Sequence, residues 1–168
     1  MALRGDIPAP LAEADRSSWD YRHAIDLIRE LKQADPEFCI GGACYPEVHP
    51  DSRTQAKDIH YLKEKVEAGC DFLTTQMFFD NSRYFSFVER CRKAGITVPI
   101  IPGIKPISTV RHIELLPQAF SIDIPQELMK ELDLEEGIIR STCSHGYGPT
   151  SDIKPEHIME KILFATDE

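Results

Sequence analysis

The segment that decides the fold is DFLTTQMFF at residues 71–79, an apolar run interrupted only by two threonines and a glutamine. Its length and its phenylalanines are typical of a buried β-strand. Amphipathic stretches flank it at residues 51–69 and 81–94, and glycines at 69 and 95 are typical of helix ends. The centre of the chain therefore predicts a helix, a strand and a second helix.

The same alternation extends in both directions. FCIGGACY at residues 38–45 and VPIIPGI at residues 98–104 are further short apolar runs, and an amphipathic run over residues 21–31 precedes the first. ALRGD at residues 2–6 resembles a strand fragment. Strands and helices that alternate about every 30 residues indicate βα units around a parallel sheet, so we expect an α/β fold.

Finer predictions concern helix ends and helix faces. We expect Asp51 or Ser52 to cap the helix before residue 71. Residues 108–132 are expected to form two helical pieces broken near Pro117 and Pro125, followed by a short strand at 137–140 and a last helix at 155–165. The inward faces of the two central helices are expected to carry Ala56, Ile59, Leu62 and Val66, and then Tyr84, Phe85, Val88 and Cys91.

Composition excludes several classes of function. The 168 residues are 42% hydrophobic and carry a net charge of −9, which indicates one globular domain and excludes nucleic acid as a favoured partner. No apolar run has the length of a membrane span, and MALRGDIPAP lacks the apolar core of a signal peptide. Five scattered cysteines predict neither a disulfide framework nor a zinc site. We therefore expect a cytoplasmic protein with no metal and no membrane partner.

Polar residues follow each expected strand. Asp6, Tyr45, His49, Gln76 and Lys105 all stand where a parallel strand would end. Each alone has an ordinary structural explanation, but the carboxyl ends of parallel strands share one side of the sheet, where ligands bind. No G-x-G-x-x-G or Walker A loop is present. The spacing of His49, Cys44 and His60 fits no standard metal site, and Ser144, His145 and Asp152 lack a nucleophile elbow.

Four motifs carry a resemblance to a known family. ALRGD at 2–6, YPEVHP at 45–50, TQMFFD at 75–80 and IPGI at 101–104 resemble the methylenetetrahydrofolate reductases in order and spacing. The resemblance covers residues 1–132, whereas residues 133–168 form a divergent tail of unknown role. A complete barrel takes about 250 residues, so the resemblance implies an incomplete (β/α)8 TIM-barrel of about four βα units plus that tail.

The resemblance also implies an activity: FAD-dependent reduction of 5,10-methylenetetrahydrofolate to 5-methyltetrahydrofolate with NAD(P)H, in one-carbon and methionine metabolism. Asp6 is the implied catalytic residue, near both flavin and pterin. By helical spacing, Asp58, Tyr61 and Lys65 share one stripe that could follow an extended cofactor, and Ser52 at a helix start could offer N–H groups to a diphosphate. The full set expected at FAD is Arg4, Gly5, Asp6, Tyr21, Tyr45, His49, Ser52, Asp58, Tyr61 and Lys65; the set expected at the folate is Asp6, Gln76 and His112.

Two alternatives to this activity stay open at this point. The chain could be a catalytically silent barrel fragment or scaffold that binds folate or a partner subunit. It could also be another folate-binding barrel that catalyses methyl transfer, although the flavin-type residues argue against this. Because four strands leave open sheet edges, we expect a homo-oligomer or a chain completed by another chain. The general-acid glutamate of the family is expected in a barrel segment not found in this sequence.

Overall fold

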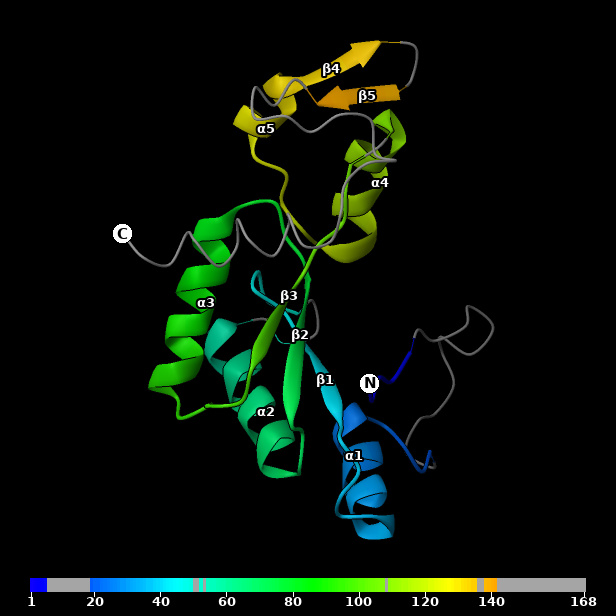
Figure 1. Ribbon diagram of the computed structural model, residues 1–168, viewed down its shortest axis with the longest axis vertical. Helices are drawn as coiled ribbons and strands as arrows, with labels where there is room; N and C mark the ends of the chain where they lie inside the picture. The colour runs from blue at the N-terminus through cyan, green and yellow to red at the C-terminus, as the bar shows by residue number, and fades with distance from the viewer. Residues whose placement is uncertain (6–18, 50–51, 53, 108, 136–137, 142–168) are drawn as a thin grey trace.

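Residues 72–77 form the central strand of a parallel sheet, as expected from the segment at 71–79. The computed structural model describes residues 1–5, 19–49, 52, 54–107, 109–135 and 138–141 (Figure 1). Strands β1 (Gly41–Cys44), β2 (Phe72–Met77) and β3 (Ile100–Gly103) pair in parallel in the order β1-β2-β3. The predicted α/β fold with a parallel sheet is therefore confirmed.

Three helices alternate with these strands and share one core with them. Helix α1 (Ala24–Ala34) precedes β1, α2 (Gln55–Glu67) joins β1 to β2, and α3 (Asn81–Lys93) joins β2 to β3 (Figure 1). Each contributes its apolar stripe, because an amphipathic helix gains stability mainly by covering the sheet. The core includes Ile28, Leu62, Phe87 and Cys91 from the helices, and Ile40, Cys44, Cys70, Leu73, Ile96 and Ile100 from the strands and their approaches.

Helix starts follow local capping chemistry, and one predicted cap is wrong. Asp80 caps α3 by accepting the Ser82 N–H at 2.8 Å. The cap of α2 is Thr54, whose hydroxyl accepts the Lys57 N–H at 3.4 Å. Ser52 lies two residues earlier and binds another group, while Asp51 lies outside the described residues. Ser52 and Thr54 both have a hydroxyl that can cap a helix, and the path of the loop places Thr54 at the first turn of α2.

The predicted inward faces are correct except at two positions. Phe87 is buried in α3, whereas Phe85 is 39% exposed. Cys91 is buried, and Phe87 lies on the same face of α3, one turn before it at i−4. Phe85 lies on a different face of the helix, which explains its exposure. In α2, Ala56 is exposed rather than part of the core.

The chain after β3 forms the two predicted helical pieces, but with a break at one of the two prolines instead of both. Helix α4 (Val110–Phe120) runs through Pro117 and ends at Ser121, which has a left-handed backbone, before α5 (Gln126–Glu131). Pro117 therefore does not break the helix, since a proline removes one hydrogen bond without preventing helical geometry on both sides. The expected short strand is found as β5 (Ile138–Ser141), and it pairs antiparallel with an unpredicted strand β4 (Leu132–Glu135).

Two further expectations concern the ends of the chain. The strand expected at residues 2–6 is reduced, among the described residues, to a single parallel bridge between Ala2 and Gly42. The helix expected at 155–165 lies outside the described residues. No helix in the described part of the chain reaches the length and apolarity that crossing a bilayer takes.

Candidate functional site

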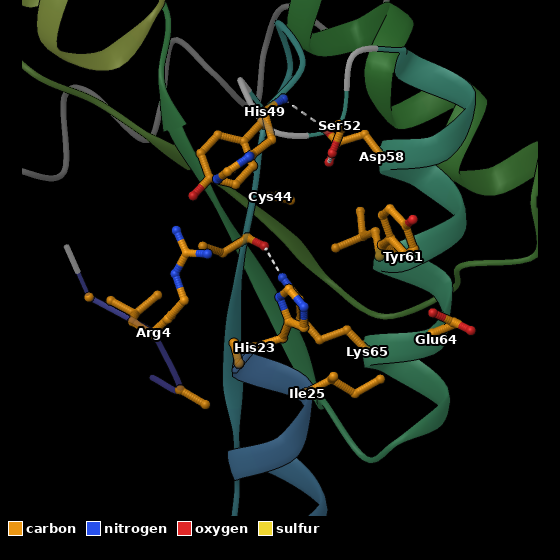
Figure 2. A pocket seen from close by; sticks show the side chains of 17 residues that line it. Arg4, His23, Ile25, Cys44, His49, Ser52, Asp58, Tyr61, Glu64 and Lys65 are labelled. Atoms are coloured by element: carbon orange, nitrogen blue, oxygen red, sulfur yellow. Dashed lines mark hydrogen bonds between the residues drawn. The ribbon is translucent and has the colours of Figure 1, made fainter. Parts of the chain in front are cut away.

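A cavity of about 680 Å³ opens at the carboxyl end of β1. Its size lies within the range of roughly 300–1,000 Å³ typical of ligand sites. Four segments enclose it: residues 2–5, the start of α1, the end of β1 with the loop that follows, and one face of α2 (Figure 2). Its lining side chains include Arg4, His23, Ile25, Cys44, Tyr45, His49, Ser52, Asp58, Tyr61, Leu62, Glu64 and Lys65.

Helix α2 supplies the polar stripe that the spacing predicts. Asp58, Tyr61 and Lys65 all line the cavity (Figure 2). The Lys65 ammonium donates to the Ala43 carbonyl at 2.8 Å, and burial lowers the pKa of Lys65. Burial also raises the pKa of the Cys44 thiol far above its usual range, so Cys44 is a neutral wall of the cavity and not a nucleophile.

The loop of residues 45–49 supplies an aromatic pair. The rings of Tyr45 and His49 meet edge to face with centroids 4.5 Å apart. Asp58 holds this loop, because its two oxygens accept the His49 N–H at 3.1 Å and the Ser52 hydroxyl at 3.0 Å.

The predicted role of the Ser52 N–H is wrong in this geometry. That N–H donates to the His49 carbonyl at 2.9 Å, so it is already used within the loop. Ser52 is also not at the start of α2, which begins after Thr54. Ser52 still lines the cavity, buried, through its side chain.

The wall opposite α2 comes from the start of the chain. Arg4 extends toward the cavity from the side facing Tyr61 (Figure 2). Gly5 has a φ of 77°, a left-handed conformation that glycine adopts without steric cost. Asp6, the expected catalytic residue, lies outside the described residues.

Among the lining residues that sequence reasoning missed, Glu64 and His23 have side chains that can carry a charge. Glu64 stands three residues after Tyr61, so the helical spacing that selected Asp58, Tyr61 and Lys65 also selects Glu64. His23 precedes α1 and donates its N–H to the Asp26 carboxylate at 2.9 Å. A sequence signal for His23 was present. The H-x-x-D spacing of His23 and Asp26 is typical of a helix start, and a helix that follows a parallel strand starts at the carboxyl end of the sheet, where the cavity lies.

Several expected site residues do not line this cavity. Tyr21 is 43% exposed and its hydroxyl donates to Glu30, which raises the pKa of Tyr21. The Gln76 side-chain oxygen accepts the Met77 N–H at 3.0 Å, where the β2–β3 register shifts. Lys105 follows β3 in an exposed segment, and His112 is half-buried in the first turn of α4. The structure therefore gathers the expected flavin residues, apart from Tyr21 and Asp6, and leaves Gln76 and His112 elsewhere.

The cavity offers both charged groups and surface for a flat ring. Arg4 and Lys65 bring two cationic groups to it, and Asp58 and Glu64 bring two carboxylates, of which that of Asp58 is engaged by the loop of residues 45–49 and Ser52. Ile25 and Leu62 add apolar surface, and Tyr45 and His49 add aromatic surface. Within the residues that the structure describes, no group of three or more His, Cys, Asp or Glu could hold a metal ion.

Comparisons with known proteins agree on one family. The family model "Methylenetetrahydrofolate reductase" matches residues 1–140. "Methylenetetrahydrofolate reductase 2" of Saccharomyces cerevisiae is 40% identical over 136 residues, which cover 79% of this chain and 23% of the yeast protein. "5,10-methylenetetrahydrofolate reductase" of Escherichia coli is 38% identical over 133 residues, which cover 79% of this chain and 43% of that protein. The chain therefore spans less than half the length of these relatives.

A solved structure shares the fold. It is an uncharacterized protein from Clostridium thermocellum, described as binding two copies of 5-methyl-5,6,7,8-tetrahydrofolic acid. The TM-score is 0.50 at 21% identity, and the match covers 64% of this chain and 38% of that one.

Proposed function

The chain belongs to the methylenetetrahydrofolate reductase family, and from this premise we propose that it forms the flavin-holding part of an FAD-dependent reductase. The proposed reaction reduces 5,10-methylenetetrahydrofolate to 5-methyltetrahydrofolate with NADH or NADPH as the electron donor. The observation that carries the proposal is the cavity at the carboxyl end of β1, where Arg4, His49 and Lys65 meet although they are far apart in the sequence.

The residues of the cavity fit FAD. Lys65 and Arg4 offer positive charge to a diphosphate, and Gly5 lets the backbone come close to a bulky ligand. Ile25 and Leu62 suit the apolar parts of the cofactor. When bound, FAD supplies the hydride carrier between the nicotinamide and the folate, which no side chain can replace.

The proposed folate residues are Asp6, Gln76 and His112. The negative charge of Asp6 would stabilise a cationic iminium form of the substrate, and the Gln76 amide stands at the carboxyl end of β2, beside the end of β1. The Clostridium thermocellum protein of the same fold, which is described as binding a methylated folate, supports folate as the substrate class.

We also propose that further strands complete the sheet. Among the described residues β3 is one edge of the sheet and β1 is the other, where Ala2 alone bridges to Gly42; Ile101 in β3 and Ile104 just after it are about half exposed. Unpaired edges and exposed apolar side chains favour closure into a (β/α)8 barrel by more chain, a second copy or another subunit. A cytoplasmic setting is proposed because Cys39, Cys44, Cys70 and Cys91 are free thiols.

Titration with FAD tests the proposal. The purified chain is mixed with FAD and run on a sizing column while absorbance near 450 nm is followed. We expect flavin to co-elute with a folded particle, and Gln76→Ala to leave that binding unchanged because Gln76 is outside the cavity. A folded chain that stays colourless contradicts the proposed function and favours the alternative of a silent scaffold.

A further inference from the structure

Val48 has a backbone conformation that its side chain disfavours. Its φ is 85°, in the left-handed region, where a β-branched residue clashes with its own backbone. Val48 lies between Tyr45 and His49, the two aromatic residues of the cavity wall. Such a conformation persists only where neighbouring contacts impose it, so some group must hold the loop on each side of Val48.

Glu47 anchors the loop of residues 45–49 immediately before Val48. One carboxylate oxygen accepts the Asp123 N–H at 2.8 Å, and the other lies 3.7 Å from the Arg83 Nε. The side chain is only 8% exposed, and the oxygen facing Arg83 is buried without a hydrogen bond. Arg83 also pairs with Asp123 at 3.1 Å and with Asp80 at 3.7 Å. Glu47 therefore ties the loop of residues 45–49 to α3 and to the segment that follows α4.

Asp58 anchors the same loop immediately after Val48. It accepts the His49 N–H at 3.1 Å from its place on α2. Two carboxylates on different elements thus fix the residues on either side of the left-handed one. Only Asp58 lines the cavity, whereas Glu47 does not.

We propose that Glu47 is a positioning residue for the cavity: it keeps Val48 left-handed and so presents the Tyr45–His49 pair to the ligand. Glu47 acts through the loop and touches neither the cavity nor its ligand. The identity of that ligand as FAD rests on the proposed function, but the geometric effect on the two rings does not.

Asp71 is a matched control. Its carboxylate also accepts a backbone N–H from another segment, that of Ile40 at 2.7 Å, and also pairs with a cation, Lys32 at 3.1 Å. It precedes β2 and therefore stands at the amino end of the sheet, away from the cavity. Removing either carboxylate is expected to reduce stability, but only the loss of Glu47 should change the cavity.

Two measurements on Glu47→Ala, Glu47→Gln and Asp71→Ala test the proposal. The first is the nuclear Overhauser effect between the Tyr45 and His49 rings without FAD, with His49→Gln used to assign the imidazole signal. The second is FAD affinity from quenching of flavin fluorescence. We expect Glu47→Ala to lose the ring–ring effect and to weaken FAD binding about tenfold, the equivalent of one charge-assisted hydrogen bond.

The conservative variant separates positioning from general destabilisation. Glu47→Gln keeps an oxygen for the Asp123 N–H, so it should retain most of the ring–ring effect. Asp71→Ala should lower the melting temperature and leave both readouts unchanged. A folded Glu47→Ala with the ring–ring effect intact and FAD affinity within about twofold of wild type overturns the proposal.

Two other outcomes are also decisive. If Glu47→Ala does not fold, Glu47→Asp keeps the charge but shortens the side chain, which withdraws the carboxylate from the Asp123 N–H, and an unchanged ring–ring effect in that variant overturns the proposal. If wild type binds no FAD, the proposed function fails, while the ring–ring effect still decides whether Glu47 positions the pair.

Discussion

The two ends of the parallel sheet are built differently. At the amino end, Asp71 accepts the Ile40 N–H, Lys32 donates to the Phe38 carbonyl at 2.8 Å, and Arg92 donates to the carbonyls of Ile96 and Val98. Each of these contacts pairs a charged side chain with a backbone group just before a strand. Such charge-assisted hydrogen bonds are among the stronger ones in proteins.

At the carboxyl end, favourable contacts are given up. Val48 is left-handed, one oxygen of Glu47 is buried without a hydrogen bond, and burial lowers the pKa of Lys65. Each feature costs stability, and all of them surround the cavity or the loop that forms its wall. The amino end therefore serves stability and the carboxyl end serves binding, the division found in parallel βα barrels.

The largest expected effect comes from a substitution in the core that supports both ends of the sheet. Phe87→Ala should lower the free energy of unfolding by about 4 kcal/mol. Phe87 is the largest fully buried side chain among the described residues, so its truncation leaves a large cavity in the core. Phe85→Ala, on the exposed side of the same helix, should cost no more than about 1 kcal/mol. Urea denaturation measures both values. Equal losses would mean that α3 presents a different face to the sheet.

An intermediate effect separates binding from stability at the carboxyl end. Lys65→Met should weaken FAD binding about tenfold through the loss of one favourable charge. Its effect on the melting temperature should be small, because the same change relieves the burial of an ammonium group. Lys63→Met, on the exposed side of α2, is the control and should change neither property. An unchanged FAD affinity in Lys65→Met would remove Lys65 from the binding residues.

The smallest expected effect is a pH dependence of opposite sign at the two ends. The Ile40 N–H and then Lys32 lower the pKa of Asp71 from 3.8, so its contribution to stability is present above pH 3.8 and is lost as pH falls through the lowered pKa. Burial raises the pKa of Glu47 from 4.5, and its contribution therefore declines as pH rises from 4.5 through the raised pKa.

Unfolding by urea at a series of pH values distinguishes the two groups. The stability of wild type relative to Asp71→Asn should increase with pH below 3.8. Relative to Glu47→Gln it should decrease with pH above 4.5. Slopes of the same sign would show that the two carboxylates do not differ in the way their surroundings indicate.

Much of the architecture could be predicted from residue patterns. Apolar runs placed β1, β2 and β3, and Gly69 and Gly95, with φ of 114° and 86°, marked the ends of α2 and α3. Helical spacing put Asp58, Tyr61 and Lys65 on one stripe. These features are local, because strand and helix periodicity and glycine chirality act within one or two turns of the chain.

Features that depend on contacts between distant segments were predicted less well. The choice of Phe87 over Phe85, and of Thr54 over Ser52, depends on the direction from which the sheet and the loop approach each helix. Glu47 lies within the motif at residues 45–50, but no role was predicted for its side chain. Its partner Asp123 is 76 residues away, and nothing near Glu47 in the sequence indicates that contact.

The sequence by itself determined the order of elements from α1 to β3, the family and the stripe on α2, because these follow from local periodicity and from motifs read along the chain. Only the tertiary structure decided which polar groups meet. It joined Arg4 and His23 to the cavity, left Tyr21 outside it, and set Glu47 against Arg83 and Asp123. The physical reason is that burial and partner distance, which determine the strength of a charge or a hydrogen bond, are properties of the assembled fold.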